Sequence, residues 1–220
     1  MRSPASGNKT GLRGRPRAED SPASSDEILL AALRAFATRG YDGTSIRELN
    51  QQLGVSHNLI NRRFGSKEQL WRATVDRWIG EVVAELATAI SDDEGDPLET
   101  LRCLIVRFID VQARRPEIAR LMNIESSIDG PRLRYLFDKF IGPWAAVADR
   151  LIKELAAAGR IRALPPGTLV FLAAYGATGM AAHPPFAEMV GVADPTDPAV
   201  IHAHAVAVAD LVLTPPGSAT

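Results

Sequence analysis

Residues 44–67 constrain the fold more than any other part of the chain, because they read as two short helices joined by a tight turn. Ser45 followed by Glu48 has the spacing of a capping box, which predicts the start of the first helix. The turn is expected at residues 53–56, where a glycine supplies permissive backbone and Ser56 is positioned to cap the second helix. The rest of the chain has to pack around this rigid pair.

The apolar residues of this stretch predict which faces are buried. In the first helix Ile46, Leu49 and Leu53 share one face, and in the second Ile60 and Phe64 are four residues apart and should face inward. The side chains left outward are His57, Asn58, Asn61 and Arg62, with Leu59 near the edge. Two helices joined in this way form a helix-turn-helix, whose second helix enters the major groove of DNA.

Apolar periodicity predicts helices along the rest of the chain, and no strand-like alternation stands out. The predicted fold class is therefore all-α, with about nine helices: a three-helix N-terminal domain at residues 25–71 and a helical C-terminal domain at residues 72–220. A long helix is expected from residue 132 to about 159. The last two helices are expected near residues 168–182 and 198–213, separated by proline-containing breaks.

Residues 1–24 are rich in Gly, Pro, Ser and Arg and lack apolar periodicity, which predicts a disordered basic arm. Its Arg13, Arg15 and Arg17 resemble the core of an AT-hook, which lays arginines into a narrow minor groove. The alternative is a solvated basic tail that adds only non-specific affinity. Residues 1–78 carry 13 Lys and Arg against 8 Asp and Glu, whereas residues 79–220 carry 12 against 18, so the positive field lies at the N-terminal end.

Several classes of protein are disfavoured. One cysteine, Cys103, allows no intrachain disulfide, and no apolar run reaches the roughly 18 residues of a membrane helix, so we expect a cytoplasmic protein without membrane contact. There is no glycine-rich phosphate loop or nucleophile elbow. His202 and His204 would point apart on a helix, which does not suit a shared metal. The chain is not expected to be an enzyme or to hold a metal or cofactor.

The N-terminal residues resemble the DNA-binding domain of the TetR family of transcriptional regulators over roughly residues 25–72. The matching positions are Ile28-Leu29, Ala32-Leu33, Phe36-Ala37, the run GYDGTSIREL at residues 40–49, LGVS at residues 53–56 and FGSKEQL at residues 64–70. The resemblance implies a homodimer that pairs through its last two helices, a C-terminal domain that binds a small-molecule effector, and a repressor that the effector releases from a palindromic operator in double-stranded DNA.

The resemblance also places residues at or near DNA. With Arg62 added for its charge, these are Ser45, Ile46, Arg47, Ser56, His57, Asn58, Leu59, Asn61, Arg62, Arg63 and Lys67. We expect Lys67 to contact phosphate, and His57 and Asn58 to read base edges. Arg47 is open between a DNA contact and a surface ion pair, and Leu59 between a thymine methyl contact and packing.

Two positions depart from the family pattern. Asn50 stands where the family usually has a small residue, often Ala, and Asn61 stands where it usually has Tyr. An asparagine can donate to a phosphate oxygen or pair with adenine, so base readout at Asn61 is possible. The missing aromatic contact would shift DNA affinity toward Arg62, Arg63 and Lys67, together with the arginines of the arm.

The effector site is predicted less sharply. Its candidate lining residues are Cys103, Phe108, Met122, Glu125, Phe137, Trp144, Tyr175 and Met180. A pocket lined by aromatic and methionine side chains would suit an apolar or aromatic ligand, but these residues could equally form plain core, with Glu125 paired to an arginine. An alternative function is an activator or a nucleoid-type DNA-coating protein dominated by the basic arm.

Overall fold

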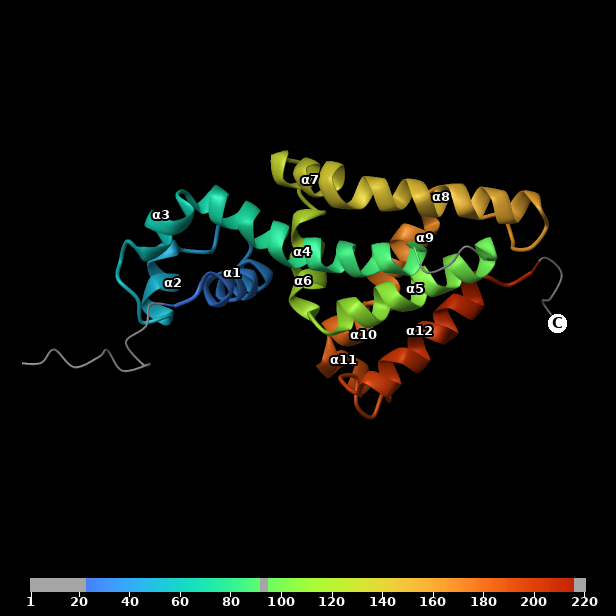
Figure 1. The fold of residues 1–220 in the computed structure, drawn as a ribbon. Helices are drawn as coiled ribbons and strands as arrows, with labels where there is room; N and C mark the ends of the chain where they lie inside the picture. The colour runs from blue at the N-terminus through green and yellow to red at the C-terminus, as the bar shows by residue number, and fades with distance from the viewer. Residues whose placement is uncertain (1–22, 92–94, 216–220) are drawn as a thin grey trace, which may run out of the picture.

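The computed structural model describes residues 23–91 and 95–215, so the predicted minor-groove arginines Arg13, Arg15 and Arg17 lie outside the described residues. All regular structure within the described ranges is helical, which confirms the all-α class (Figure 1). The first helices are α1 (Ser25–Arg39), α2 (Ile46–Gln52), α3 (Leu59–Phe64) and α4 (Lys67–Ser91). The C-terminal helices are α5 (Pro97–Ala113), α6 (Pro116–Glu125), α7 (Pro131–Leu136), α8 (Gly142–Ala157), α9 (Thr168–Phe171), α10 (Gly179–Ala182), α11 (Pro184–Met189) and α12 (Pro198–Val212).

The ends of α1 follow from its sequence. The Ser24 hydroxyl accepts a hydrogen bond from the Glu27 N–H at 3.2 Å, and the Glu27 carboxylate accepts one from the Ser24 N–H at 2.6 Å, which completes a capping box. These bonds to Ser24 lower the pKa of the Glu27 carboxyl group. At the other end Gly40, with φ +69°, ends the helix in a conformation that favours glycine.

The helix-turn-helix and the C-terminal body share one hydrophobic core. Figure 1 shows α1, α2 and α3 gathered at one end, with α4 running from them into the body. Trp71 of α4 is completely buried, and the cluster around it joins the N-terminal helices to Ile118 and Leu121 of α6 and Leu136 of α7. The domain boundary predicted at residue 71 therefore falls inside a continuous helix, at a point where the core is also continuous.

A second core holds the far end of the body together. Leu101 and Ile105 of α5 pack with Leu155 of α8, and Ala205 and Ala209 of α12 are completely buried in the same cluster. Small side chains at these two positions let α12 approach α5 closely. Ala205 and Ala209 are therefore used within one chain, in a helix that the family resemblance predicts to pair with a second chain.

Two features differ from the predicted helices. The long helix is continuous but contains a π-helical segment, η2 (Phe137–Ile141), and the following helix contains a second, η3 (Leu172–Ala177). The prolines at positions 184 and 185, expected to separate two helices, begin the short helix α11 instead. Proline is tolerated in the first turn of a helix, because the N–H it lacks would have no intrahelical partner there.

Candidate nucleic-acid interface

The helix-turn-helix forms as predicted, except at the start of its second helix. The Ser45 hydroxyl accepts from the Glu48 N–H at 3.5 Å and caps α2. Ser56 does not cap α3, which begins only at Leu59, with Asn58 at the cap position and no side-chain cap bond. The Ser56 carbonyl accepts from the Leu59 N–H at 2.9 Å, so Ser56 belongs to the turn and the prediction of a Ser56 cap was wrong.

A residue of α2 replaces the missing cap. Asn50 is completely buried, and its Nδ2 donates to the His57 carbonyl at 2.9 Å while its Oδ1 accepts from the Ile60 N–H at 3.4 Å. Sequence reasoning noted Asn50 only as a departure from a family pattern. The signal that could have revealed its role is a polar residue one position after Leu49, on the inward side of an amphipathic helix.

The outward face of α3 agrees with the apolar pattern. His57, Asn58, Asn61 and Arg62 are all exposed. Leu59 is only 7% exposed and packs in the first core, so the packing alternative describes it rather than an outward position. These placements make a polar and basic surface along one side of α3, and contact of its members with DNA stays a prediction.

Two basic residues in and beside α3 donate hydrogen bonds to backbone oxygens. Lys67 begins α4, and its Nζ donates to the Asp42 carbonyl at 3.3 Å while lying 4.6 Å from the centre of the Tyr41 ring. Arg63 donates to the Ala23 carbonyl at 2.7 Å, next to the point where the predicted arm joins the described residues. Arg47 is exposed and forms no ion pair among the described residues, which leaves its guanidinium accessible.

The turn before α2 is the junction between the two halves of the molecule. Tyr41 stacks on Phe36 with ring centres 6.0 Å apart, and the Arg132 guanidinium lies 4.0 Å from the centre of the Tyr41 ring. Arg132 Nε donates to both carboxylate oxygens of the buried Glu125, at 2.9 and 3.1 Å. Burial raises the pKa of the Tyr41 hydroxyl, and the nearby Glu68 carboxylate adds to the shift. The Tyr41 ring thus adds a contact between the start of α7 and the helix-turn-helix, beside the apolar core that already joins the two halves.

The residues predicted to line the effector pocket lie in several different surroundings. Glu125 pairs with an arginine, which was the alternative to a ligand contact, while Phe137 and Tyr175 are exposed. Cys103, Phe108, Met122, Trp144 and Met180 are partly buried and pack against the two cores. None of these eight residues lines either cavity described below, so the sequence prediction of the pocket lining finds no support in the cavities.

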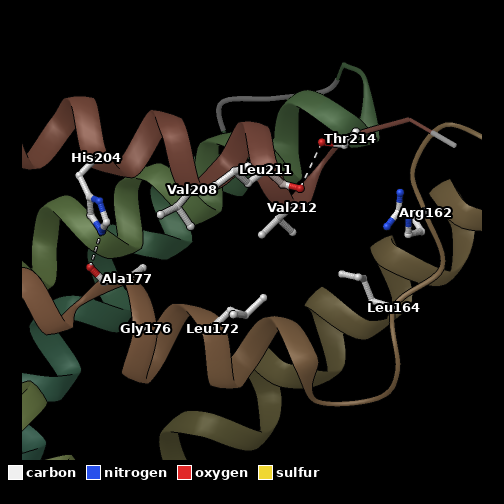
Figure 2. Close-up of a pocket in the computed structure, with 10 residues that line it drawn as sticks. All are labelled: Arg162, Leu164, Leu172, Gly176, Ala177, His204, Val208, Leu211, Val212 and Thr214. Carbon is white, nitrogen blue, oxygen red and sulfur yellow. Dashed lines mark hydrogen bonds between the residues drawn. The ribbon is translucent and has the colours of Figure 1, made fainter. Parts of the chain in front are cut away.

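The larger cavity, of about 370 Å³, lies between η3 and α12 (Figure 2). Its walls are mainly apolar, with the Arg162 side chain near one end and His204 near the other. His204 Nε2 lies 3.1 Å from the Ala177 carbonyl. The residues that line this larger cavity are Arg162, Leu164, Leu172, Gly176, Ala177, His204, Val208, Leu211, Val212 and Thr214. A smaller cavity, of about 230 Å³, lies between α8 and the segment before α9.

The two histidines of α12 have different surroundings. His202 Nδ1 lies 2.8 Å from a carboxylate oxygen of Asp110, whereas His204 turns toward the cavity. No group of three or more side chains suited to a metal ion occurs among the described residues. Within the same ranges, no helix has both the length and the apolar character needed to span a membrane.

Comparison with known proteins agrees with this architecture. Residues 28–74 match the family model described as bacterial regulatory proteins of the tetR family. The chain is 28% identical over 126 residues to the HTH-type transcriptional repressor NicS of Pseudomonas putida, covering 57% of each chain. It is 31% identical over 107 residues to the HTH-type transcriptional activator FasR of Mycolicibacterium smegmatis, covering 49% of this chain and 46% of FasR. The chain thus spans about half the length of these curated relatives.

Solved structures extend the likeness beyond the N-terminal helices. The structure of AibR in complex with isovaleryl coenzyme A and operator DNA matches with a TM-score of 0.64 at 20% identity, over 86% of this chain and 97% of that chain. FadR from Bacillus subtilis in complex with stearoyl-CoA matches with a TM-score of 0.60 at 18% identity, over 85% and 96% of the two chains. At these identities the likeness shows a shared fold. Residues 28–74 thus match the TetR family of bacterial regulatory proteins, the curated relatives support a TetR family regulator, and the rest of the chain shares the fold of these structures.

Proposed function

We propose that this protein is a dimeric, sequence-specific DNA-binding repressor that leaves a palindromic operator when a small molecule binds its C-terminal body. The observation that carries the proposal is the exposed polar and basic side of α3, on a helix fixed by its own turn and by α4. An exposed recognition helix flanked by basic residues is the arrangement that reads base edges while phosphate contacts set its position.

The residues divide between two kinds of DNA contact. His57, Asn58 and Asn61 lie where base edges would be met, and an asparagine can pair with adenine. Lys67 and Arg62 lie beside them and would contact phosphate. The bond from Lys67 to the Asp42 carbonyl holds its ammonium group close to the α1–α2 turn, which supports a fixed position for this contact.

An apolar face supports the proposed dimer. Phe171 of α9, Leu172 and Tyr175 of η3, and Leu211 of α12 are 67%, 45%, 40% and 78% exposed. Large exposed apolar side chains gathered on two neighbouring helical stretches are typical of an interface. Pairing about a two-fold axis would bury them, and it would present two α3 helices to a palindromic operator.

A chain of contacts supports coupling between the body and the DNA-binding end. The Tyr175 hydroxyl of η3 donates to Ser126 Oγ at 2.6 Å, beside Glu125, which pairs with Arg132 over the Tyr41 ring. A small molecule that changes how these elements pack would shift the populations of two arrangements, only one of which fits successive major grooves. AibR and FadR, which share the fold, were solved with coenzyme A esters, which supports a ligand for the body without naming it.

The test is a titration of the purified protein against DNA from upstream of its own gene, with a shuffled duplex of equal length as control. Preferential binding at low salt, with two protomers per site, supports the proposal. Equal binding to both duplexes contradicts it. A thermal-shift screen of small molecules then seeks the effector, because a ligand at 100 times its dissociation constant adds about 2.7 kcal/mol of stability. The effector found should release the DNA.

The second candidate is an activator or a DNA-coating protein dominated by the arm. One curated relative is named an activator, and Arg63 ties Ala23 to α3, so the arm would leave the protein beside the recognition helix. Deleting residues 1–22 tests the contribution of the arm and leaves the Ser24 cap of α1 intact. If the sequence preference survives, α3 reads the site; if all binding is lost, the arm dominates.

A further inference from the structure

Asn50 is a polar side chain enclosed within the helix-turn-helix and bonded at both ends. It is completely buried, its amide nitrogen donates to the His57 carbonyl at 2.9 Å, and its amide oxygen accepts from the Ile60 N–H at 3.4 Å. Its own backbone carbonyl accepts from the Val55 N–H at 3.0 Å. Asn50 therefore forms hydrogen bonds with Val55, His57 and Ile60, just before and at the start of α3.

The start of α3 needs this support. The first N–H groups of a helix have no partner inside the helix, and a side chain at the cap position usually satisfies one of them. Asn58 occupies the cap position of α3 but makes no such bond. Ile60 is completely buried, so water is a poor substitute for the oxygen of Asn50 at its N–H.

The bonds of Asn50 also span two of the three residues proposed to read base edges, and the third, Asn61, follows directly. His57 is held through its carbonyl oxygen and Ile60 through its N–H, and the exposed Asn58 lies between them. Changing Asn50 would loosen the backbone at these positions while removing no group that could touch DNA. The side chain is enclosed by protein, so it makes no base or phosphate contact of its own.

We propose that Asn50 is a specificity-determining positioning residue: it fixes the register in which the start of α3 presents its side chains to base edges. The inference rests on the proposed sequence-specific DNA binding. It separates Asn50 from an ordinary core residue, because loss of an ordinary core contact weakens folding without choosing between DNA sequences. An alanine at this position would leave both the His57 carbonyl and the Ile60 N–H without this partner.

The experiment uses the full chain and a duplex that the unmodified protein selects from a random DNA library, with a shuffled duplex of equal length for comparison. Asn50→Leu keeps the number and branching of the side-chain heavy atoms and removes both hydrogen bonds of the side chain. The matched control is Thr74→Val, which removes the bond from a completely buried hydroxyl to the Leu70 carbonyl in α4, away from the turn. The measured quantity is the ratio of affinities for the selected and shuffled duplexes, together with its salt dependence.

Asn50→Leu is expected to lower this ratio about tenfold, comparable to losing one specific base contact, while binding to the shuffled duplex and its salt slope stay unchanged. Thr74→Val is expected to keep the ratio. An unchanged ratio for a folded Asn50→Leu protein overturns the inference and leaves the proposed function intact. Failure of the unmodified protein to select any sequence removes both.

A second measurement needs no substitution. In the unmodified protein without DNA, hydrogen exchange at the Ile60 amide should be slowed about as much as at amides inside α3, because Asn50 accepts its hydrogen bond. If Ile60 exchanges as fast as an unprotected helix-end amide, Asn50 does not hold the start of α3 and the inference is wrong. This measurement decides the point even if Asn50→Leu fails to fold.

Discussion

The two ends of the molecule expose different chemistry. At the helix-turn-helix end, the outward side of α3 carries polar and basic groups such as Asn61 and Arg62. Among the described residues, the large exposed apolar side chains all lie at or after Ile128, and several gather on η3, α11 and α12. The difference supports the two proposed partners: DNA at the N-terminal end, and the apolar face of a second copy at the C-terminal end.

The two ends also bury polar groups differently. The helix-turn-helix satisfies Asn50 with backbone groups of its own turn, over a sequence separation of ten residues or fewer. The junction with the body instead buries a carboxylate, Glu125, and pairs it with the side chain of Arg132. Both contacts are local in sequence, since Glu125 and Arg132 are seven residues apart; the difference is that backbone groups satisfy Asn50, whereas a charged side chain satisfies Glu125.

The largest effect on stability is expected from removing the ion pair at the junction. Arg132→Ala leaves the Glu125 carboxylate buried without its partner, which is expected to cost about 3–5 kcal/mol of unfolding free energy. The measurement is urea unfolding followed by circular dichroism. Arg134→Ala is the control, because its Asp129 partner is highly exposed and its loss should cost less than about 1 kcal/mol. Equal losses of unfolding free energy in the two variants would show that the burial of Glu125 does not increase the contribution of its ion pair to stability.

The apolar end is tested by placing a charge on it. Leu211→Glu in α12 is expected to weaken dimerisation at least about 30-fold, as loss of an interface residue worth about 2 kcal/mol would. Sedimentation over a range of protein concentrations measures the change. Met189→Glu in α11 is the control, since Met189 is 85% exposed but lies outside the two helical stretches proposed to pair. A larger effect from Met189→Glu would move the interface to α11.

The basic end is tested through salt. Lys67→Gln is expected to reduce the slope of log affinity against log salt by about 0.9, because one phosphate contact is lost. Titrations of the same duplex at several salt concentrations give the slope. Lys153→Gln, in α8 on the body, should leave it unchanged. If the two slopes agree, the field that attracts DNA does not come from the Lys67 side of the molecule.

The smallest expected effect is a pH dependence within the body. The bond from Arg160 lowers the pKa of the Asp96 carboxyl group from 3.8 to about 2, and the Leu98 N–H adds to the shift. A lowered pKa in the folded state stabilises the fold above pH 3.8, and this stabilisation is lost as the pH falls toward 2.

Removing the partner of Asp96 tests this. Arg160→Gln should therefore unfold at slightly higher pH than the unmodified protein during acid titration, while the two proteins should converge below about pH 2. Arg150→Gln, an exposed residue of α8, is the control. An acid transition in Arg160→Gln identical to that of the unmodified protein would show that this pair contributes nothing to folding.

The N-terminal end was largely predictable because its signals are local. Capping residues and apolar spacing placed α1 and α2, and they placed Asn61 and Arg62 outward. The start of α3 was placed too early, because Ser56 fits a cap by residue type and only the turn geometry shows that α3 starts at Leu59. The role of Asn50 also depends on that geometry.

The body was predictable as helices, and its pocket lining stays a prediction. The aromatic and methionine residues predicted to line a pocket pack against the two cores or are exposed, and they do not line the cavity between η3 and α12, where Leu172 and Val208 face each other. Periodicity identifies the face of a helix that is buried. It does not tell whether that face meets another helix or a hollow, because this depends on residues far apart in the sequence.

By itself, the sequence determined the all-α class, the helix-turn-helix and the outward side of its second helix, since each depends on residues within a few turns of one another. The tertiary structure decided the rest: the packing of Arg132 against the Tyr41 ring, the burial of Ala205 and Ala209 against α5, and the position of the cavity. These features follow from packing between distant segments, in which the space left by all the side chains together sets what each residue contacts.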